Sequence, residues 1–274
     1  MKEVVTQPVC LTIAGLDPSG GAGIIADIKT FAAFGCFAAA AVSSVTFQNT
    51  TGVFGAVHQT ADSVRRQVEP VLDDYDVAAL KTGMLPTSEI IEEVANIIDE
   101  RGLKNIVVDP VVRSTSGFDL IDDAALAGLI EKLFPLADLI TPNIPEAERI
   151  SRMKIASPDD IHKAAERMRS LGAKNVLIKG GHVLNAECGI RNAELENRKA
   201  TDHLFTGDGV QLFEAEFIET TAIHGTGCTL AAAITANLAL GIALAESVRI
   251  AKDFVTEAIR TAPNLGKVNS PINI

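Results

Sequence analysis

Phosphate chemistry is the first possibility raised by residues 224–230, His-Gly-Thr-Gly-Cys-Thr-Leu, which precede a run of small apolar residues. Two glycines before a good helix former allow a tight turn, and they leave backbone N–H groups pointing out of the helix start. A helix N-terminus carries partial positive charge and therefore attracts anions, phosphate above all. The same field is expected to lower the pKa of the Cys228 thiol. The structural alternative is an ordinary capped helix with a buried cysteine.

Two carboxylates, Asp109 and Glu146, are candidate metal ligands. Mg²⁺ commonly takes one or two carboxylates and completes its shell with water and phosphate oxygens. Structural explanations exist for both residues, because Asp109 precedes a proline and can cap a turn. Asn143 and Glu146 have the spacing of a helix cap followed by an acid in the first turn.

Lys179 stands beside two glycines, an arrangement that suits a phosphate contact better than packing. His182 and His224 are expected to serve structure rather than proton transfer, because neither has an evident acidic partner in the sequence.

The elements that position these residues alternate between short β-branched runs and helical patterns. Strands are predicted at 9–14, 38–46, 77–80, 105–108, 139–140 and 176–179, and helices at 24–34, 63–72, 89–101, 120–134, 157–171 and from about 227 and 244. This alternation with apolar strands predicts an α/β fold whose parallel sheet is covered on both faces. The turn at 206–209 with residues 210–217 indicates a hairpin or antiparallel edge. We expect one domain, residues 1–274.

Ligands of open parallel sheets bind beyond the carboxyl ends of the strands. Polar, charged or glycine-rich segments follow the predicted strands one after another: 15–23, 48–50, 81–84, 109–111, 141–146 and 179–182, with 225–228 at the helix start. The glycine run at 15–23 matches neither the P-loop pattern nor a clean G-x-G-x-x-G. It is expected to let the backbone approach a small flat ligand.

Composition excludes several other classes of protein. The formal net charge of −11 without a compensating basic block makes nucleic acid and anionic membranes poor partners. Four cysteines without a C-x-x-C pair argue against zinc and a disulfide scaffold and fit a reducing compartment. The alanine-rich stretches 31–47 and 228–245 are expected to be buried elements of a core, and the start of the chain lacks a secretory pattern. We expect a cytoplasmic protein.

The ordered motifs resemble those of the hydroxymethylpyrimidine/phosphomethylpyrimidine kinases of thiamine biosynthesis, a family of the ribokinase-like superfamily. The resemblance covers nearly the whole chain and rests on 14–24, 48–50, 81–84, 109–111, 141–143, 179–182 and 224–230. It implies a ribokinase-like, three-layer α/β/α sandwich with a mostly parallel central sheet, and it suggests a homodimer.

The resemblance also implies roles for residues of an acceptor pocket. Gln48 would hydrogen-bond the pyrimidine, a role for which a carboxamide is suited as both donor and acceptor. Gly15, Asp27 and Met84 would line the same pocket. Leu16, Phe47 and Arg113 depart from the family pattern, as does the segment 184–206, and these departures bear on pocket size and substrate range.

On the phosphate side, the resemblance assigns Mg²⁺ and ATP to Asp109, Asn143 and Glu146, with both carboxylates as metal ligands. Lys179 would neutralise the phosphates, and Gly225, Thr226, Gly227 and Cys228 would form a catalytic anion hole. Cys228 stands where many relatives in the superfamily carry an aspartate base.

The predicted activity is ATP-dependent phosphorylation of 4-amino-5-hydroxymethyl-2-methylpyrimidine and of its monophosphate. The nearest alternative is a pyridoxal or pyridoxine kinase, because a flat hydroxymethyl heterocycle fits the same chemistry. Two other classes are weaker. A non-catalytic pyrimidine- or nucleotide-binding regulator would lack the metal and anion-hole residues, and a cysteine hydrolase would need a His–acid partner for Cys228.

Overall fold

The computed structural model describes residues 7–112, 120–180 and 199–274. Gly181, His182, Cys188, Arg113 and most of the segment 184–206 therefore lie outside the described residues. A nine-stranded sheet in the order β3-β2-β1-β4-β5-β6-β7-β8-β9 runs through the structure. Its strands are β1 (Val9–Leu16), β2 (Phe37–Asn49), β3 (Gly52–His58), β4 (Val77–Thr82), β5 (Ile106–Val108), β6 (Leu139–Ile140), β7 (Val176–Ile178), β8 (Lys199–Thr206) and β9 (Gly209–Glu216).

The central pairings from β2 to β7 are parallel, whereas β3, β8 and β9 add antiparallel edges. The predicted hairpin is confirmed, since β8 and β9 pair through the turn from Thr206 to Gly209. The predicted α/β class with a mostly parallel sheet is also confirmed.

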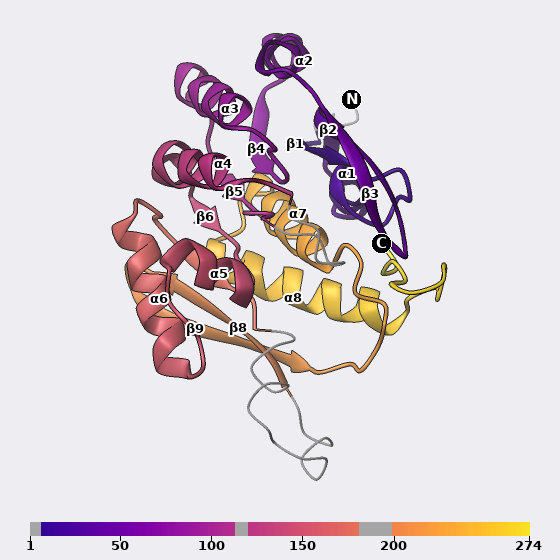
Figure 1. The fold of residues 1–274 in the computed structure, drawn as a ribbon, viewed down its shortest axis with the longest axis vertical. Helices are drawn as coiled ribbons and strands as arrows, with labels where there is room; N and C mark the ends of the chain where they lie inside the picture. Colours follow the sequence, from indigo (N-terminus) through magenta and orange to yellow (C-terminus); the bar gives the residue numbers. More distant parts are fainter. Residues whose placement is uncertain (1–6, 113–119, 181–198) are drawn as a thin grey trace, which may run out of the picture.

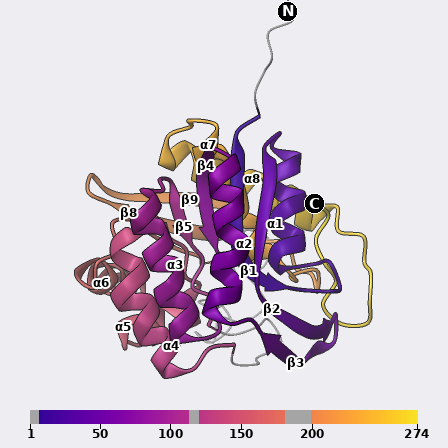
Figure 2. The same cartoon turned by 90° about the horizontal axis from the view of Figure 1, so that it is seen from above.

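Helices cover both faces of the sheet (Figures 1 and 2). One face carries α2 (Ala61–Asp74), α3 (Ser88–Arg101), α4 (Asp123–Gly128), α5 (Ile144–Ser151) and α6 (Pro158–Ser170), and the other carries α1 (Gly23–Ala33), α7 (Thr226–Ala239) and α8 (Leu244–Arg260). The three layers follow from strand geometry, because successive side chains point to opposite faces. Ile106 and Val108 join the core under the first group, while Val107 between them packs with α7 and α8.

Three local predictions need correction. No strand was expected at β3, whose residues are largely half-buried or exposed and include two glycines, so it lacks the apolar signal of a buried strand. The helix predicted at 120–134 is shorter: α4 passes into a π-helical turn (Leu129–Leu133) and a 3₁₀ turn (Phe134–Leu136). Pro135 has no N–H with which to continue α-helical bonding. The short helix α5 was foreseen only as a possible cap at Asn143.

The two alanine-rich stretches are core elements, as expected, and contribute to β2 and α7. Within the described ranges, no helix combines the length and apolar character needed to cross a membrane.

Candidate active site

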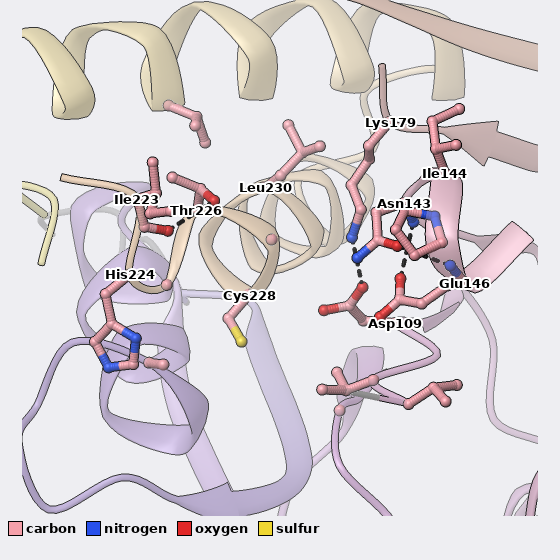
Figure 3. Close-up of a pocket in the computed structure, with 18 of the residues that line it drawn as sticks. Asp109, Asn143, Ile144, Glu146, Lys179, Ile223, His224, Thr226, Cys228 and Leu230 are labelled. Carbon is pink, nitrogen blue, oxygen red and sulfur yellow. Dashed lines mark hydrogen bonds and ion pairs between the residues drawn. The ribbon is translucent and has the colours of Figure 1, made fainter. Parts of the chain in front are cut away.

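A cavity of about 830 Å³ lies at the carboxyl ends of the parallel strands. It brings together most of the predicted site residues from seven separate segments: Gly15, Gln48, Met84, Asp109, Asn143, Glu146, Lys179, Gly225, Thr226, Gly227 and Cys228. Figure 3 shows Cys228 between His224 on one side and the Asp109–Lys179 pair on the other. One end of this cavity is charged and the other is built of neutral groups.

The charged end centres on Asp109 and Lys179. Asp109 directly follows β5, where its N–H donates to Thr82 O at 2.9 Å, and Lys179 directly follows β7, where its N–H donates to Pro142 O at 2.9 Å. Lys179 Nζ donates to Asp109 Oδ1 at 3.0 Å, and Thr141 Oγ1 donates to the same oxygen at 2.9 Å. The second carboxylate oxygen of Asp109 has no hydrogen-bond donor among the described residues.

Burial opposes ionisation of both partners, but each holds the other in its charged form. Desolvation raises the pKa of Asp109, yet Lys179 and then Lys81 outweigh it and leave that pKa below its usual range. Desolvation likewise opposes the charge on Lys179, but Asp109 and Glu146 raise its pKa above the usual value. The pair is therefore ionised, and it offers both a cation and an oxygen ligand to the cavity.

Asn143 and Glu146 form a reciprocal cap at the start of α5. Asn143 Oδ1 accepts from the Glu146 N–H at 2.9 Å, and Glu146 Oε2 accepts from the Asn143 N–H at 2.8 Å. The structural explanation of this spacing is therefore confirmed. Burial raises the pKa of Glu146 to about 7, with Lys179 opposing this rise and the charge of Asp109 adding to it. A ligand role requires the carboxylate form, which a bound cation would favour.

The start of α7 is shaped by glycines. Gly225 caps the helix with φ +85°, and a Cβ there would lie only 1.8 Å from Gly21 O. A Cβ on Gly227 would lie 3.2 Å from Lys179 Nζ, so the glycine lets the lysine and the helix start converge. Among the described residues, no acceptor bonds the N–H groups of Gly227 and Cys228, which fits an anion site.

The sequence predicted a lowered pKa for the Cys228 thiol, and this prediction is wrong. Burial raises the pKa of Cys228 to about 11, although Lys81 and the N–H of Gly23 act in the opposite direction. The cavity wall shields the sulfur from water more strongly than the helix field stabilises a thiolate. This disfavours a cysteine hydrolase, which needs an activated thiolate.

The neutral end of the cavity is formed by Gly15, Gln48 and Met84. A Cβ on Gly15 would lie 3.1 Å from Met84 Sδ, so glycine keeps this wall open. Gln48 follows an irregularity in the register between β2 and β3. Neither Leu16 nor Phe47, two of the departures from the family pattern, is among the residues that line the cavity.

Asp27 does not line the cavity, in contrast to the prediction. Its carboxylate is fully buried and accepts from Lys81 Nζ at 2.7 and 2.8 Å and from Thr12 Oγ1 at 2.7 Å. Lys81 itself lines the cavity and was not predicted as a site residue. Its place in the Lys-Thr-Gly-Met segment at the end of β4 was the available signal, because that end of the sheet gathers ligands.

His224 does have an acidic partner, which the sequence did not reveal. Its Nε2 lies 2.7 Å from Asp17 Oδ2, and 207 residues separate the two in the chain. No hydrogen bond joins His224 to Cys228 among the described residues. The expected structural role of His224 therefore fits its surroundings.

A neutral pocket and a charged end, joined at a helix start in a three-layer α/β/α fold, are the arrangement expected of a kinase that acts on a small molecule. The model of the family described as phosphomethylpyrimidine kinase matches residues 17–273, and the chain belongs to that family. The fold is ribokinase-like.

The hydroxymethylpyrimidine/phosphomethylpyrimidine kinase of Bacillus subtilis is 43% identical over 263 residues, covering 96% of this chain and 93% of that protein. A thiamine biosynthesis bifunctional protein of Geobacter sulfurreducens is 41% identical over 96% of this chain, which spans 51% of that relative. Among solved structures, an ADP complex of Bacillus subtilis pyridoxal kinase has a TM-score of 0.85 at 37% identity, covering 98% of this chain and 97% of that one. These findings confirm the predicted family and its phosphotransferase class, whereas the roles of individual site residues stay predictions.

Proposed function

We propose that this kinase transfers the γ-phosphoryl group of ATP to 4-amino-5-hydroxymethyl-2-methylpyrimidine and then to its monophosphate, as a step of thiamine biosynthesis. The observation that carries the proposal is a single cavity that joins Gln48 at its neutral end to Asp109, Lys179 and the start of α7 at its charged end. The names of the Bacillus and Geobacter relatives support the choice of substrate.

In this mechanism, Gln48 hydrogen-bonds the ring, and the hydroxymethyl oxygen faces the start of α7. The oxygen attacks the γ-phosphorus in line as the bond to the leaving ADP oxygen breaks, and the hydroxyl proton passes to a phosphate oxygen or to water. In the second transfer the attacking atom is a phosphate oxygen of the monophosphate. Lys179 and the N–H groups of Gly227 and Cys228 stabilise charge on the equatorial oxygens. Because such transition states are largely dissociative, alignment and electrostatics matter more than the strength of a base. A neutral thiol at Cys228 is compatible with this chemistry.

The residues fit Mg²⁺. One oxygen of Asp109 accepts from no donor among the described residues, and Glu146 lies close enough to interact with Asp109 and Lys179. The described residues contain no cluster of three His, Cys, Asp or Glu side chains that would hold a metal alone, so water and phosphate oxygens would complete the shell. Asp109 and Glu146 would hold the ion, which would offset charge on the ATP phosphates.

The test measures ADP release coupled to product formation across a panel of hydroxymethyl heterocycles. The pyrimidine and its monophosphate should give the highest kcat/KM. Gln48→Leu keeps a similar volume but leaves polar ring atoms unpaired, so pyrimidine affinity should fall by about 1–3 kcal/mol while ATP affinity is unchanged. An unchanged KM for the pyrimidine at saturating ATP contradicts the pocket assignment.

Phosphorylation of pyridoxal is the second candidate. It is favoured by the likeness to the Bacillus pyridoxal kinase over nearly all of both chains. The neutral end, with Gly15 against Met84, accepts a flat heteroaromatic ring of either kind. A direct comparison of kcat/KM for the pyrimidine and for pyridoxal decides between them.

We further propose a homodimer of one-domain subunits, residues 1–274, in the cytoplasm. Phe47, Phe54 and Val57 on β2 and β3 are 51%, 68% and 54% exposed, and exposed apolar groups beside an edge strand favour association. Cys10, Cys36 and Cys228 are free thiols, which suits a reducing compartment. Sedimentation equilibrium tests the dimer, and a monomer at micromolar concentration contradicts it.

A further inference from the structure

The segment after α8, residues 264–272, contacts both the turn that follows β2 and the residue that precedes the start of α7. At one end it holds Thr50, which follows β2 two residues after Gln48. Asn269 N–H donates to Thr50 O at 2.9 Å, and Lys267 N–H donates to Thr50 Oγ1 at 3.0 Å. Gly266 has φ +83°, and a Cβ there would lie 2.2 Å from Thr50 Oγ1. The segment is thus seated closely on the turn that follows the Gln48 strand.

At its other end the same segment holds His224, the residue before Gly225 of the helix start. The N–H of His224 donates to Ser270 O at 3.3 Å. A Cβ on Gly21 would lie 3.0 Å from Pro271 Cβ and 2.4 Å from His224 Cδ2. The loop that contains Gly21 is therefore in close contact with His224 and Pro271. Ile272 is buried beyond them.

Asp17 extends this connection to the loop between β1 and α1. Its Oδ1 accepts from Ser19 N–H at 2.8 Å, and its Oδ2 accepts from Ser19 Oγ at 2.9 Å and from Ala22 N–H at 2.9 Å. The same Oδ2 lies 2.7 Å from Nε2 of His224. Burial opposes the charge on Asp17, but hydrogen bonds from His224 and Ser19 lower its pKa below the usual range, so the acceptor is a carboxylate.

We propose that residues 264–272, together with the Asp17–His224 pair, form a strap that sets the distance between the acceptor pocket and the phosphate-binding helix start. The inference rests on the proposed kinase function. Asp17 and His224 are positioning residues here, acting through the loop and the helix start. Since a displacement of about 1 Å at a reacting centre can lower a rate 100-fold, loosening the strap should reduce kcat. Nucleotide binding at Asn143, Glu146 and Lys179 lies outside the strap and should persist.

Gly266→Ala and Gly241→Ala provide a matched pair. Both glycines have positive φ, +83° and +79°, so both variants bear similar backbone strain, but an added Cβ meets Thr50 only at Gly266. Gly266→Ala should lower kcat at least about 10-fold, leave KM for ATP within about twofold, and release more ADP than phosphorylated product. Gly241→Ala should retain wild-type kcat per folded molecule. Equal kcat and equal ADP-to-product ratios in the two variants would overturn the proposal.

Substitutions at His224 test the second half of the strap. His224→Gln keeps an N–H donor toward Asp17, whereas His224→Leu removes it. The glutamine variant should recover most of the kcat lost in the leucine variant, while similar kcat losses in both contradict the role of the Asp17–His224 pair.

Hydrogen exchange separates failure of the strap from failure of the proposed function. If wild-type protein phosphorylates no heterocycle of the panel, the proposed function fails. The strap is then judged by amide protection: in Gly266→Ala, residues 17–22 and 49–52 should lose protection together, relative to Gly241→Ala. Loss confined to 49–52 shows that the strap does not couple the two ends.

Discussion

The buried lysine–aspartate pairs near the cavity are not all alike, and Lys81–Asp27 differs in geometry from Lys179–Asp109. Lys81 and Asp27 are both fully buried, and Lys81 Nζ reaches both oxygens of a carboxylate that also accepts from Thr12. In the other pair, Lys179 Nζ and Thr141 share one oxygen of Asp109, and the second oxygen has no donor within the described part of the chain. The Lys179 side chain is 13% exposed.

Burial and charge alone therefore do not identify a binding site. Both oxygens of the Asp27 carboxylate accept from protein donors, whereas only one oxygen of Asp109 does so among the residues that the structure describes. We infer that the Lys81–Asp27 pair mainly stabilises the fold, and that the Lys179–Asp109 pair mainly serves phosphate and metal. Variants of each pair should therefore differ in whether stability or activity suffers.

Lys81→Met should have the largest effect, on stability. It leaves the Asp27 carboxylate buried without its cation, which should lower the free energy of unfolding by about 3–5 kcal/mol. The double variant Lys81→Met/Asp27→Asn removes both charges and keeps an acceptor for Thr12, so it should recover most of that loss. Urea denaturation measures both. Should Lys81→Met unfold like wild type while kcat collapses, Lys81 belongs to the catalytic group instead.

Asp109→Ala should act mainly on turnover. It removes the free carboxylate oxygen near the predicted phosphate and metal positions, so kcat should fall by about 100-fold or more with a modest change in unfolding. Asp62→Ala, at a side chain 74% exposed and paired with Arg66, is the control and should keep wild-type kcat. Near-normal turnover of Asp109→Ala at saturating Mg²⁺ rules out the assigned role.

The two pairs also show which parts of the site could be predicted from the sequence and which could not. The segments that follow the strands were readable because parallel strands place their carboxyl ends at one edge, and this located Asp109 and Lys179. The partner of each buried charge was not readable. Asp27 pairs with a residue 54 positions away, and Asp17 with one 207 positions away, and no local pattern links them.

The elements of the fold also divide into those that the sequence predicted and those that it did not. Buried strands and amphipathic helices carry periodic apolar signals, so most central elements were predicted within a few residues. β3 lacks that signal because it is an edge strand with half-buried and exposed side chains. The pKa of Cys228 was predicted in the wrong direction because sequence reveals a helix start but not the depth of burial around it.

Glu146→Gln tests whether the buried Glu146 at the charged end of the cavity lowers the free energy of unfolding. Because burial raises the pKa of Glu146 to about 7, above the unfolded value, the native state binds a proton more tightly than the unfolded chain. The free energy of unfolding should therefore fall as pH rises from about 4.5 to 7. Glu146→Gln should remove about 1–3 kcal/mol of this fall, so that its stability relative to wild type is greater at pH 8 than at pH 5, while Mg²⁺-dependent turnover drops. Parallel stability–pH curves for the two proteins would falsify the assignment.

Cys228, whose pKa is influenced by Lys81, Asp27 and Asp109, should show the smallest effect on turnover. If alignment and the backbone N–H groups of α7 carry most of the catalysis, Cys228→Ser should keep kcat within about 10-fold of wild type. Cys228→Ala should lose more, because it offers no polar contact to the attacking hydroxyl. A loss in Cys228→Ser as large as in Asp109→Ala would show that the thiol itself is indispensable.

Alkylation measures the balance of burial and helix field at the same residue. Because burial raises the pKa of Cys228 to about 11, its modification by iodoacetamide should be slow at pH 7 and rise about tenfold per pH unit up to pH 10. MgATP should protect it, since phosphate would cover the helix start. Peptide mapping separates Cys228 from the buried Cys10 and Cys36. An alkylation rate at Cys228 that levels off near pH 7 would mean that Lys81 and the helix field outweigh burial. Lys81 would then be assigned to the chemistry of the site rather than to the stability of the fold.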